Sequence, residues 1–184
     1  PEYYARMEQV AKSAGTAAAI SIGWDPGLFS LNRMLAGAIL PNGEDHTFWG
    51  KGVSQGHSDA IRRIAGVKDA KQYTVPKHEI IDAVRGGRES AAPSHEAHTR
   101  ECFVVAEEGA DKAAIEKAIV TMPNYFADYE TGVHFISEEE FREKHAEIPH
   151  GGFVFRTGET SPGVCQVIEF ALKLDSNPEF TASV

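Results

Sequence analysis

Short apolar segments with the pattern of strands alternate with helical segments along the whole chain, and this alternation constrains the fold more than any other feature. Helices normally cover the faces of the sheet in such a chain. The expected fold class is therefore α/β (α+β), with one mixed β-sheet covered by helices. Strands are predicted at residues 16–22, 46–50, 67–76, 100–106, 128–136, 152–156 and 164–174, with a hairpin turn at 157–163, and helices at 3–14, 28–40, 55–64, 77–86, 111–122 and 138–146.

The starts of two helices carry recognisable signals. Ser54 is expected to cap the helix that follows it. Ser137 and Glu140 have the spacing of a capping box, in which each side chain bonds a backbone N–H group near the other residue. The sequence WDPG, at residues 24–27, breaks the chain sharply after the first apolar segment. These signals place helix starts after residues 54 and 137 and a tight turn near residue 25.

Charge and composition exclude several classes of protein. The 184 residues carry a formal net charge of −9 and contain no basic block, which argues against a nucleic-acid surface. No apolar run reaches the length of a transmembrane helix, so no membrane contact is expected. Hydrophobic residues make up 42% of the chain, which is enough for a core. Cys102 and Cys165 lie in apolar runs and are expected to be buried free thiols, with a disulfide as the less favoured alternative.

The two ends of the chain read as parts of longer elements. Residues 1–22 form a helix followed by a strand, a unit that normally continues an upstream array of strands and helices. The stretch NPEFTASV, at residues 177–184, reads as a turn that opens a helix. We therefore expect one domain of a longer enzyme.

The segment from Phe48 to Thr74 gathers glycines, hydroxyls, a Gln and a His around an expected strand-to-helix turn. Backbone N–H groups converge at such turns, so a polar ligand is favoured there. Gly50, Gly52 and Gly56 spell GxGxxxG, which resembles a dinucleotide-binding turn but lacks the acidic residue expected about 20 residues later. The same stretch contains GxSxG, but helix capping explains its Ser better than a hydrolase nucleophile does.

Five further polar residues have both a functional and a structural interpretation. His95 and His98 have a spacing that suits a metal, but no third ligand stands at a recognisable offset, so a structural role is favoured. Asp25 follows an apolar strand and either binds an ammonium group, acts as a base, or favours the turn before Pro. Arg100 is a natural partner for a carboxylate or an exposed strand end. His150 lies beside two glycines, where a ligand can approach closely or a turn can form.

Seven segments, spread over nearly the whole chain, point to one family. Together they resemble the meso-diaminopimelate dehydrogenases, and the long runs around WDPG and SQGHSDA carry most of the likeness. The segments are SIGWDPGLFSLNR (21–33), HTFWGKGVSQGHSDAIRRI (46–64), QYTVP (72–76), RECFVVA (100–106), MPNYF (122–126), PHGG (149–152) and LKLDSNPEFTAS (172–183).

The resemblance implies a domain arrangement, a cofactor and a partner. In that family an N-terminal Rossmann domain binds NADP, and a central domain binds the substrate and forms a homodimer. Residues 1–22 would then be the helix and strand leading in from the Rossmann domain. Residues 23–184 would be the substrate-binding and dimerisation domain. NADP would be bound outside this chain, no metal is expected, and the location would be cytoplasmic.

The resemblance also assigns a substrate site. Meso-diaminopimelate carries an amino-acid head at each end, so its site needs two carboxylate clamps and two ammonium acceptors. Asp25 would be the catalytic residue that faces the reacting ammonium, and Arg100 would pair with the distal carboxylate. The reacting D-configured head is assigned to Asp25, Trp49, Gln55 and Gly56, and the distal L-configured head to Thr74, Arg100, His150 and Asn177.

The implied reaction is the reversible oxidative deamination of the D-centre, which yields L-2-amino-6-oxopimelate and ammonia and belongs to lysine and peptidoglycan precursor metabolism. The chain alone is expected to bind substrate weakly or not at all, without turnover. A dihydrodipicolinate reductase is an alternative enzyme, but its paired-His and Lys signature is absent from the sequence. A non-catalytic amino-acid-binding or dimerisation module is the alternative from another class.

Overall fold

The computed structural model describes residues 2–19, 22–87, 92–147 and 149–174. Within them, seven helices and seven strands are assigned. The helices are α1 (Glu2–Ala14), α2 (Leu28–Ile39), α3 (Gln55–Arg62), α4 (His78–Arg85), α5 (Ser94–Ala97), α6 (Lys112–Val120) and α7 (Glu138–His145). The strands are β1 (Gly43–Trp49), β2 (Gly52–Val53), β3 (Val67–Pro76), β4 (His98–Ala106), β5 (Glu130–Phe135), β6 (His150–Ser161) and β7 (Val164–Leu174).

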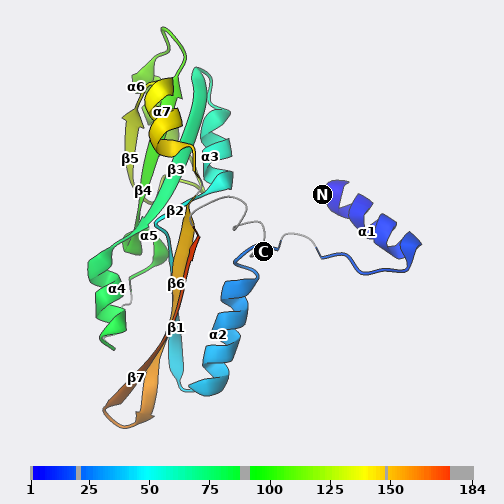
Figure 1. Cartoon of the computed structure of the whole chain (residues 1–184), viewed down its shortest axis with the longest axis vertical. Coiled ribbons are helices and arrows are strands. Elements are labelled where there is room, and N and C mark those ends of the chain that lie inside the picture. Colours follow the sequence, from blue (N-terminus) through cyan, green and yellow to red (C-terminus); the bar gives the residue numbers. More distant parts are fainter. Residues whose placement is uncertain (1, 20–21, 88–91, 148, 175–184) are drawn as a thin grey trace.

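The strands form two sheets. One is antiparallel, with the order β1-β6-β7, and the other is mixed, with the order β2-β3-β4-β5 and a parallel β4–β5 pair. The predicted α/β class is confirmed, but the prediction of a single mixed sheet was wrong. The chain leaves the first sheet at Trp49 and enters the second at Gly52, so two neighbouring strands that look continuous in the sequence belong to different sheets. Figure 1 shows the two sheets meeting near β2.

Each sheet has its own core. On the mixed sheet, Ile61 of α3 and Ile119 of α6 pack with Val104 of β4, and all three are fully buried. On the three-stranded sheet, α2 covers one face through Phe29, which packs with Val154. A separate cluster of Phe48, Ile81, Val84, Ala97 and Phe155 places α4 against the same sheet. The helices thus fix both sheets while leaving their junction accessible.

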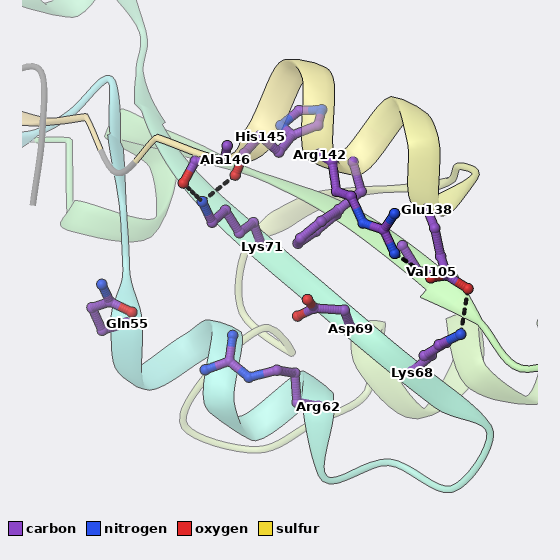
Figure 2. Close-up of a pocket in the computed structure, with 11 residues that line it drawn as sticks. Gln55, Arg62, Lys68, Asp69, Lys71, Val105, Glu138, Arg142, His145 and Ala146 are labelled. Carbon is purple, nitrogen blue, oxygen red and sulfur yellow. Dashed lines mark hydrogen bonds and ion pairs between the residues drawn. The ribbon is translucent and has the colours of Figure 1, made fainter.

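Helix α7 is fastened at both ends. The Ser137 hydroxyl accepts a hydrogen bond from the Glu140 N–H at 3.1 Å, which confirms half of the predicted capping box. The Glu140 side chain instead pairs with Lys144. At the other end, the Lys71 ammonium of β3 donates to the carbonyls of His145, Ala146 and Glu147, and Figure 2 shows the first two of these bonds. The last carbonyls of a helix lack partners within it, so Lys71 satisfies them and holds the segment that leads into β6.

The first helix lies apart from both sheets (Figure 1). The predicted helix at 3–14 is confirmed as α1, in which only Ala11 is buried. The predicted strand at 16–22 was wrong for residues 16–19 and 22, which are not in a strand; residues 20 and 21 lie outside the described residues. Strand formation needs a paired neighbour, and the described residues offer none at this point. Among the helices described, none combines the length and the apolar character needed to cross a membrane.

The two cysteines have different surroundings. Cys102 is fully buried in the core of the mixed sheet, and burial raises the pKa of its thiol to about 12. Cys165 is exposed near the β6–β7 turn, so the prediction that both are buried was wrong for this residue. It lies on an edge strand, which packs on one side only, and an apolar run does not distinguish an edge strand from a central one. Both thiols are free.

Candidate functional site

A cavity of about 370 Å³ lies where the two sheets meet. Its walls come from β1, β2 and β6 and from the first turn of α3, and its floor includes neighbouring residues of β3 and β4. Residues far apart in the sequence therefore converge on one space. Five of the eight predicted site residues line it, namely Asp25, Trp49, Thr74, Arg100 and His150.

The other three predicted residues are placed differently. Gln55 begins α3 and lines a larger cavity of about 500 Å³ between α3 and α7, shown in Figure 2. Gly56 is exposed, and a methyl group added there would meet no atom within 4 Å. Asn177 lies outside the described residues. Gln55 and Gly56 nevertheless stand beside Ser54, which lines the smaller cavity, so the first turn of α3 borders both spaces.

Arg100 supplies a buried positive charge. It lies opposite Thr74 in the β3–β4 register, and its Nη1 donates a hydrogen bond to the Thr74 hydroxyl. Its guanidinium carbon is 4.0 Å from the centre of the Tyr129 ring. Burial lowers the pKa of Arg100, and no carboxylate of the described residues forms an ion pair with it. A buried cation without a counter-ion favours an anionic ligand, because the anion restores the electrostatic stabilisation lost with water.

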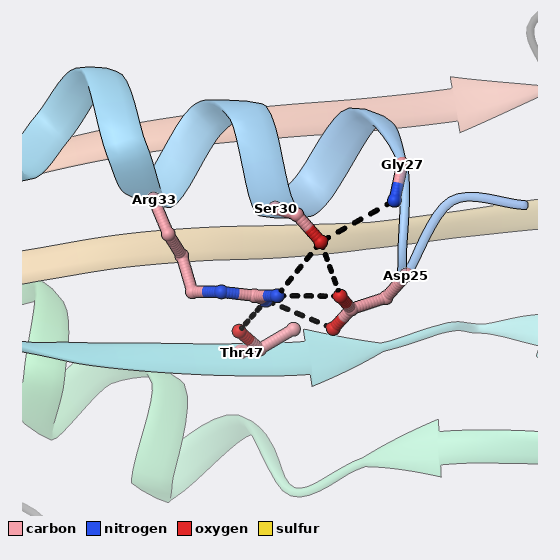
Figure 3. Close-up of polar contacts among 5 residues, drawn as sticks. All are labelled: Asp25, Gly27, Ser30, Arg33 and Thr47. Carbon is pink, nitrogen blue, oxygen red and sulfur yellow. Dashed lines mark hydrogen bonds and ion pairs between the residues drawn. The ribbon is translucent and has the colours of Figure 1, made fainter. Parts of the chain in front are cut away.

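Asp25 supplies a fixed negative charge. Figure 3 shows its carboxylate held by the Arg33 guanidinium and by the Ser30 hydroxyl, which donates to it at 2.8 Å. Arg33 also donates to Thr47 of β1, so the group ties α2 to the sheet. The hydrogen bond from Arg33 lowers the pKa of Asp25, against a smaller opposing effect of burial. The carboxylate is therefore ionised at neutral pH and suits an ammonium group better than it suits the role of a base.

Gly52 lies close to His150, and its lack of a side chain leaves room for the histidine. The His150 ring packs edge-on against Trp24, with ring centres 4.3 Å apart, and burial lowers its pKa. A methyl group at Gly52 would lie 3.1 Å from the His150 Cα atom and 3.3 Å from its Nδ1 atom. Glycine at this position therefore lets β2 pass close to the histidine.

Trp49 is held through its backbone by His98, for which the sequence favoured a structural role over metal binding. The Trp49 N–H donates to His98 Nε2 at 2.9 Å, and His98 Nδ1–H donates to the Ser94 carbonyl at 2.8 Å. Both nitrogens of His98 are thus occupied, and the favoured structural role of this residue fits the geometry. The hydrogen-bond partner of His98 is Trp49, which lies on β1 and is distant in the sequence. The sequence around His95 and His98 therefore could not indicate this contact.

Comparison with known proteins adds family information to this geometry. The sequence profile described as the diaminopimelic acid dehydrogenase C-terminal domain matches residues 23–176. This chain belongs to that family. Meso-diaminopimelate D-dehydrogenase of Ureibacillus thermosphaericus is 58% identical over 183 residues, and the alignment covers 100% of this chain and 56% of that protein. The Corynebacterium glutamicum protein of the same name is 49% identical, with 100% and 57% covered. The chain thus spans little more than half the length of these relatives.

Solved structures of the diaminopimelate dehydrogenase family share the fold. The C. glutamicum enzyme in complex with diaminopimelate has a TM-score of 0.85 and 50% identity, covering 94% of this chain and 53% of that one. A six-fold variant of the Clostridium tetani enzyme with diaminopimelate has a TM-score of 0.86 and 54% identity, covering 100% and 57%. An engineered D-amino acid dehydrogenase bound to NADP+ has a TM-score of 0.80 and 48% identity, covering 89% and 50%.

Two polar side chains of this diaminopimelate dehydrogenase domain, those of Ser54 and His57, line the cavity and were not predicted as site residues. Ser54 precedes α3 but makes no capping bond with its side chain, so that prediction was wrong: its hydroxyl is hydrogen-bonded to His57 Nδ1 at 2.7 Å. Burial, aided by the nearby Arg100 cation, lowers the pKa of His57 to about 4. Such an imidazole is a weak base, and no described carboxylate orients it, so the pair does not suit a hydrolase. The SxxH spacing at a helix start is the sequence signal from which the Ser54–His57 pair could have been predicted.

Proposed function

We propose that this chain is the substrate-binding part of an NADP-dependent meso-diaminopimelate D-dehydrogenase. One observation carries the proposal: a single cavity is lined by a buried cation, Arg100, that has no carboxylate partner among the described residues, and by an ionised carboxylate, Asp25. An amino acid offers the complementary pair of charges, a carboxylate and an ammonium group. The names of the relatives supply the identity of that amino acid.

The proposed roles follow the two heads of the substrate. Thr74, Arg100 and His150 bind the distal L-configured head, together with Asn177. Asp25 and Trp49 bind the reacting D-configured head, together with Gln55 and Gly56. The substitutions in the C. tetani variant support this assignment. The six replaced residues have the same types and the same spacing along the chain as Gln55, Thr74, Arg100, Pro149, His150 and Asn177.

The chain contributes orientation and charge rather than the redox step. When bound, NADP+ would supply the acceptor for the hydride of the D-carbon, while the substrate nitrogen loses a proton to solvent so that the carbon–nitrogen double bond can form. The imine left on the substrate is then hydrolysed to L-2-amino-6-oxopimelate and ammonia. Asp25 holds the reacting ammonium by its charge, and the Trp49 ring, packed 4.9 Å from the Phe29 ring, helps to exclude water.

We place the NADP site outside these residues. A methyl group at Gly50 would lie 2.0 Å from the Thr74 carbonyl oxygen, and one at Gly52 would press on His150. The first two glycines of GxGxxxG are therefore explained by close backbone packing rather than by the approach of a pyrophosphate. We further propose a role in lysine and peptidoglycan precursor metabolism in the cytoplasm.

NADP+ reduction by the full-length protein tests this function. With meso-diaminopimelate as substrate, Arg100→Ala is expected to lower kcat/KM by about a hundredfold or more, because the distal carboxylate loses a charged hydrogen-bond partner. Arg142→Ala, at an exposed arginine of α7, serves as the matched control and should retain activity. A folded, NADP-binding wild type that turns over no diaminopimelate isomer would contradict the proposal, as would NADPH production by the 184-residue chain alone.

We also propose a homodimer, with α2 at the contact. Leu31, Met34, Leu35 and Ile39 lie on the exposed side of this helix, and each is more than half exposed. Met34→Glu should convert the dimer to a monomer in analytical ultracentrifugation, whereas Val164→Glu on the β6–β7 hairpin should not. A monomeric wild type at micromolar concentration would refute this assembly.

A further inference from the structure

Gln72 is a completely buried polar residue next to the proposed substrate site. It lies two residues before Thr74 on β3, so both side chains lie on the same face of the strand. Its backbone is fixed on both sides: its N–H donates to the Ser58 hydroxyl at 3.0 Å, and its carbonyl accepts from the Ser54 N–H at 3.0 Å. A buried amide needs a reason to be there, because an apolar side chain would avoid the loss of hydration.

The hydrogen bonds of the Thr74 hydroxyl suggest that reason. A hydroxyl accepts through two lone pairs and donates through one hydrogen. Here the Thr74 oxygen accepts from Arg100 Nη1 and from Gln72 Nε2, the latter at 3.4 Å. Both acceptor positions are thus used, and only the O–H donor remains. Because Thr74 lines the cavity, that hydrogen is available to an acceptor inside it.

We propose that Gln72 is a positioning residue that holds the Thr74 hydroxyl as a donor toward the carboxylate bound by Arg100. The inference rests on the proposed function and extends it to a residue that does not itself line the cavity. Without the Gln72 amide, the hydroxyl hydrogen can rotate toward other acceptors, and the carboxylate site loses an aligned donor.

The buried polar atoms without a partner support this assignment. Among the described residues, the side-chain atoms in this state are Arg100 Nε and Gln72 Oε1. Arg100 Nε is a second donor on the same guanidinium, and no described residue accepts its hydrogen. Gln72 Oε1 is an acceptor, which suits an ordered water next to this anion site. The cluster therefore presents donors to one carboxylate and is supported from behind by Gln72.

Substrate preference gives a test that general loss of folding would not mimic. D-lysine has the carbon chain and reacting head of meso-diaminopimelate but lacks the distal carboxylate. In the full-length protein, Gln72→Met, which preserves volume but removes the amide, should lower the ratio of kcat/KM for meso-diaminopimelate to that for D-lysine by about tenfold. The change should appear mainly in KM for meso-diaminopimelate, because the distal head is remote from the reacting carbon.

Further variants complete the design. Thr74→Val should lower the same ratio, and adding Gln72→Met to it should have almost no further effect, since Gln72 acts through the hydroxyl that is already missing. Cys102→Ala, at the buried residue opposite Gln72 in the register, is the control for a weakened sheet and should leave the ratio unchanged. If Gln72→Met does not fold, Gln72→Glu replaces it, because its carboxylate would take the Thr74 hydrogen and pair with Arg100, and the ratio should again fall.

The outcomes separate this inference from the proposed function. A wild type that is inactive with meso-diaminopimelate contradicts the function itself. An active wild type whose Gln72 variants keep the wild-type substrate ratio, or whose effects add to that of Thr74→Val, overturns the role of Gln72 alone.

Discussion

At the scale of the residue, the His98 imidazole shows how one buried side chain places a proposed site residue. It receives the Trp49 N–H and donates to the Ser94 carbonyl, so it joins β1 of one sheet to the start of β4 in the other. Its ring also lies 5.9 Å from that of Phe48. Trp49 is therefore located by its backbone as well as by the packing of its indole.

Replacement of His98 should be costly for this reason. His98→Phe keeps a ring of similar size but leaves the Trp49 N–H without an acceptor, and the free energy of unfolding should fall by about 1–3 kcal/mol. Urea denaturation of both proteins measures the difference. His95→Phe is the matched control, because the His95 side chain is 46% exposed and should change stability little. Equal stabilities of His98→Phe and wild type would show that the bond is dispensable.

Several of the proposed site residues could be predicted from the sequence because they lie in motifs with a family resemblance. Asp25, Trp49, Thr74, Arg100 and His150 were all placed in this way, and they converge on one cavity. The residues that support them could not be predicted. The roles of His98, Gln72 and Arg33 depend on which strand or loop lies opposite, and local patterns carry no information about that.

At the scale of the element, Lys71 links strand β3 to the C-terminal end of α7. Its pKa is lowered, chiefly by burial, although it donates to three carbonyls. The same strand carries Lys68, which forms an exposed pair with Glu138 at the start of α7. Two lysines of one strand thus hold the same helix, Lys71 from a partly buried position and Lys68 from an exposed one. Their contributions to stability can therefore be compared directly.

Lys71→Met should destabilise the protein more than Lys68→Met does. Loss of the Lys71 bonds leaves carbonyls at a partly buried helix end unsatisfied, and we expect a fall of about 1–3 kcal/mol in the free energy of unfolding. An exposed ion pair contributes about 0–1 kcal/mol, so the Lys68 variant should stay near wild type. Thermal or urea unfolding of the Lys71→Met and Lys68→Met variants measures which of them is less stable. A larger effect of Lys68→Met would contradict the prediction.

The elements themselves were predicted better than their arrangement. Helix starts and apolar periodicity located α2, α3, α6 and α7 to within a few residues. The division into two sheets was missed because it depends on pairing between distant segments, such as Thr47 of β1 with Val154 of β6. The strand expected after α1 was predicted wrongly for residues 16–19 and 22, because apolar composition alone does not supply a pairing partner.

At the scale of the whole molecule, buried histidines set the response to acid. Burial lowers the pKa values of His57, His98 and His150 below the usual 6.5, in the case of His57 to about 4. The unfolded chain therefore takes up protons at a higher pH than the folded chain does. The stability that these neutral imidazoles contribute is complete above about pH 6.5 and is lost as the pH falls from there toward the folded pKa values.

The free energy of unfolding should therefore be nearly constant between about pH 7 and 8 and should fall below about pH 6.5. Each imidazole adds a slope of up to about 1.4 kcal/mol per pH unit. Urea denaturation across about pH 4.5–8 measures the curve, and His57→Phe should make it shallower. A stability that stays level down to about pH 4.5 would contradict the prediction.

The meeting of two sheets at the cavity has a consequence for substrate length. Thr74 and Arg100 belong to the mixed sheet, whereas Trp49 belongs to the three-stranded sheet and Asp25 to the turn before its covering helix. The two ends of a bound diamino acid would then be held by separately built halves of the molecule. Under the proposed function, the number of methylene groups between the heads would be selected by how far apart the sheets stand, and repacking their junction would be the route to accepting a shorter or longer dicarboxylic diamine.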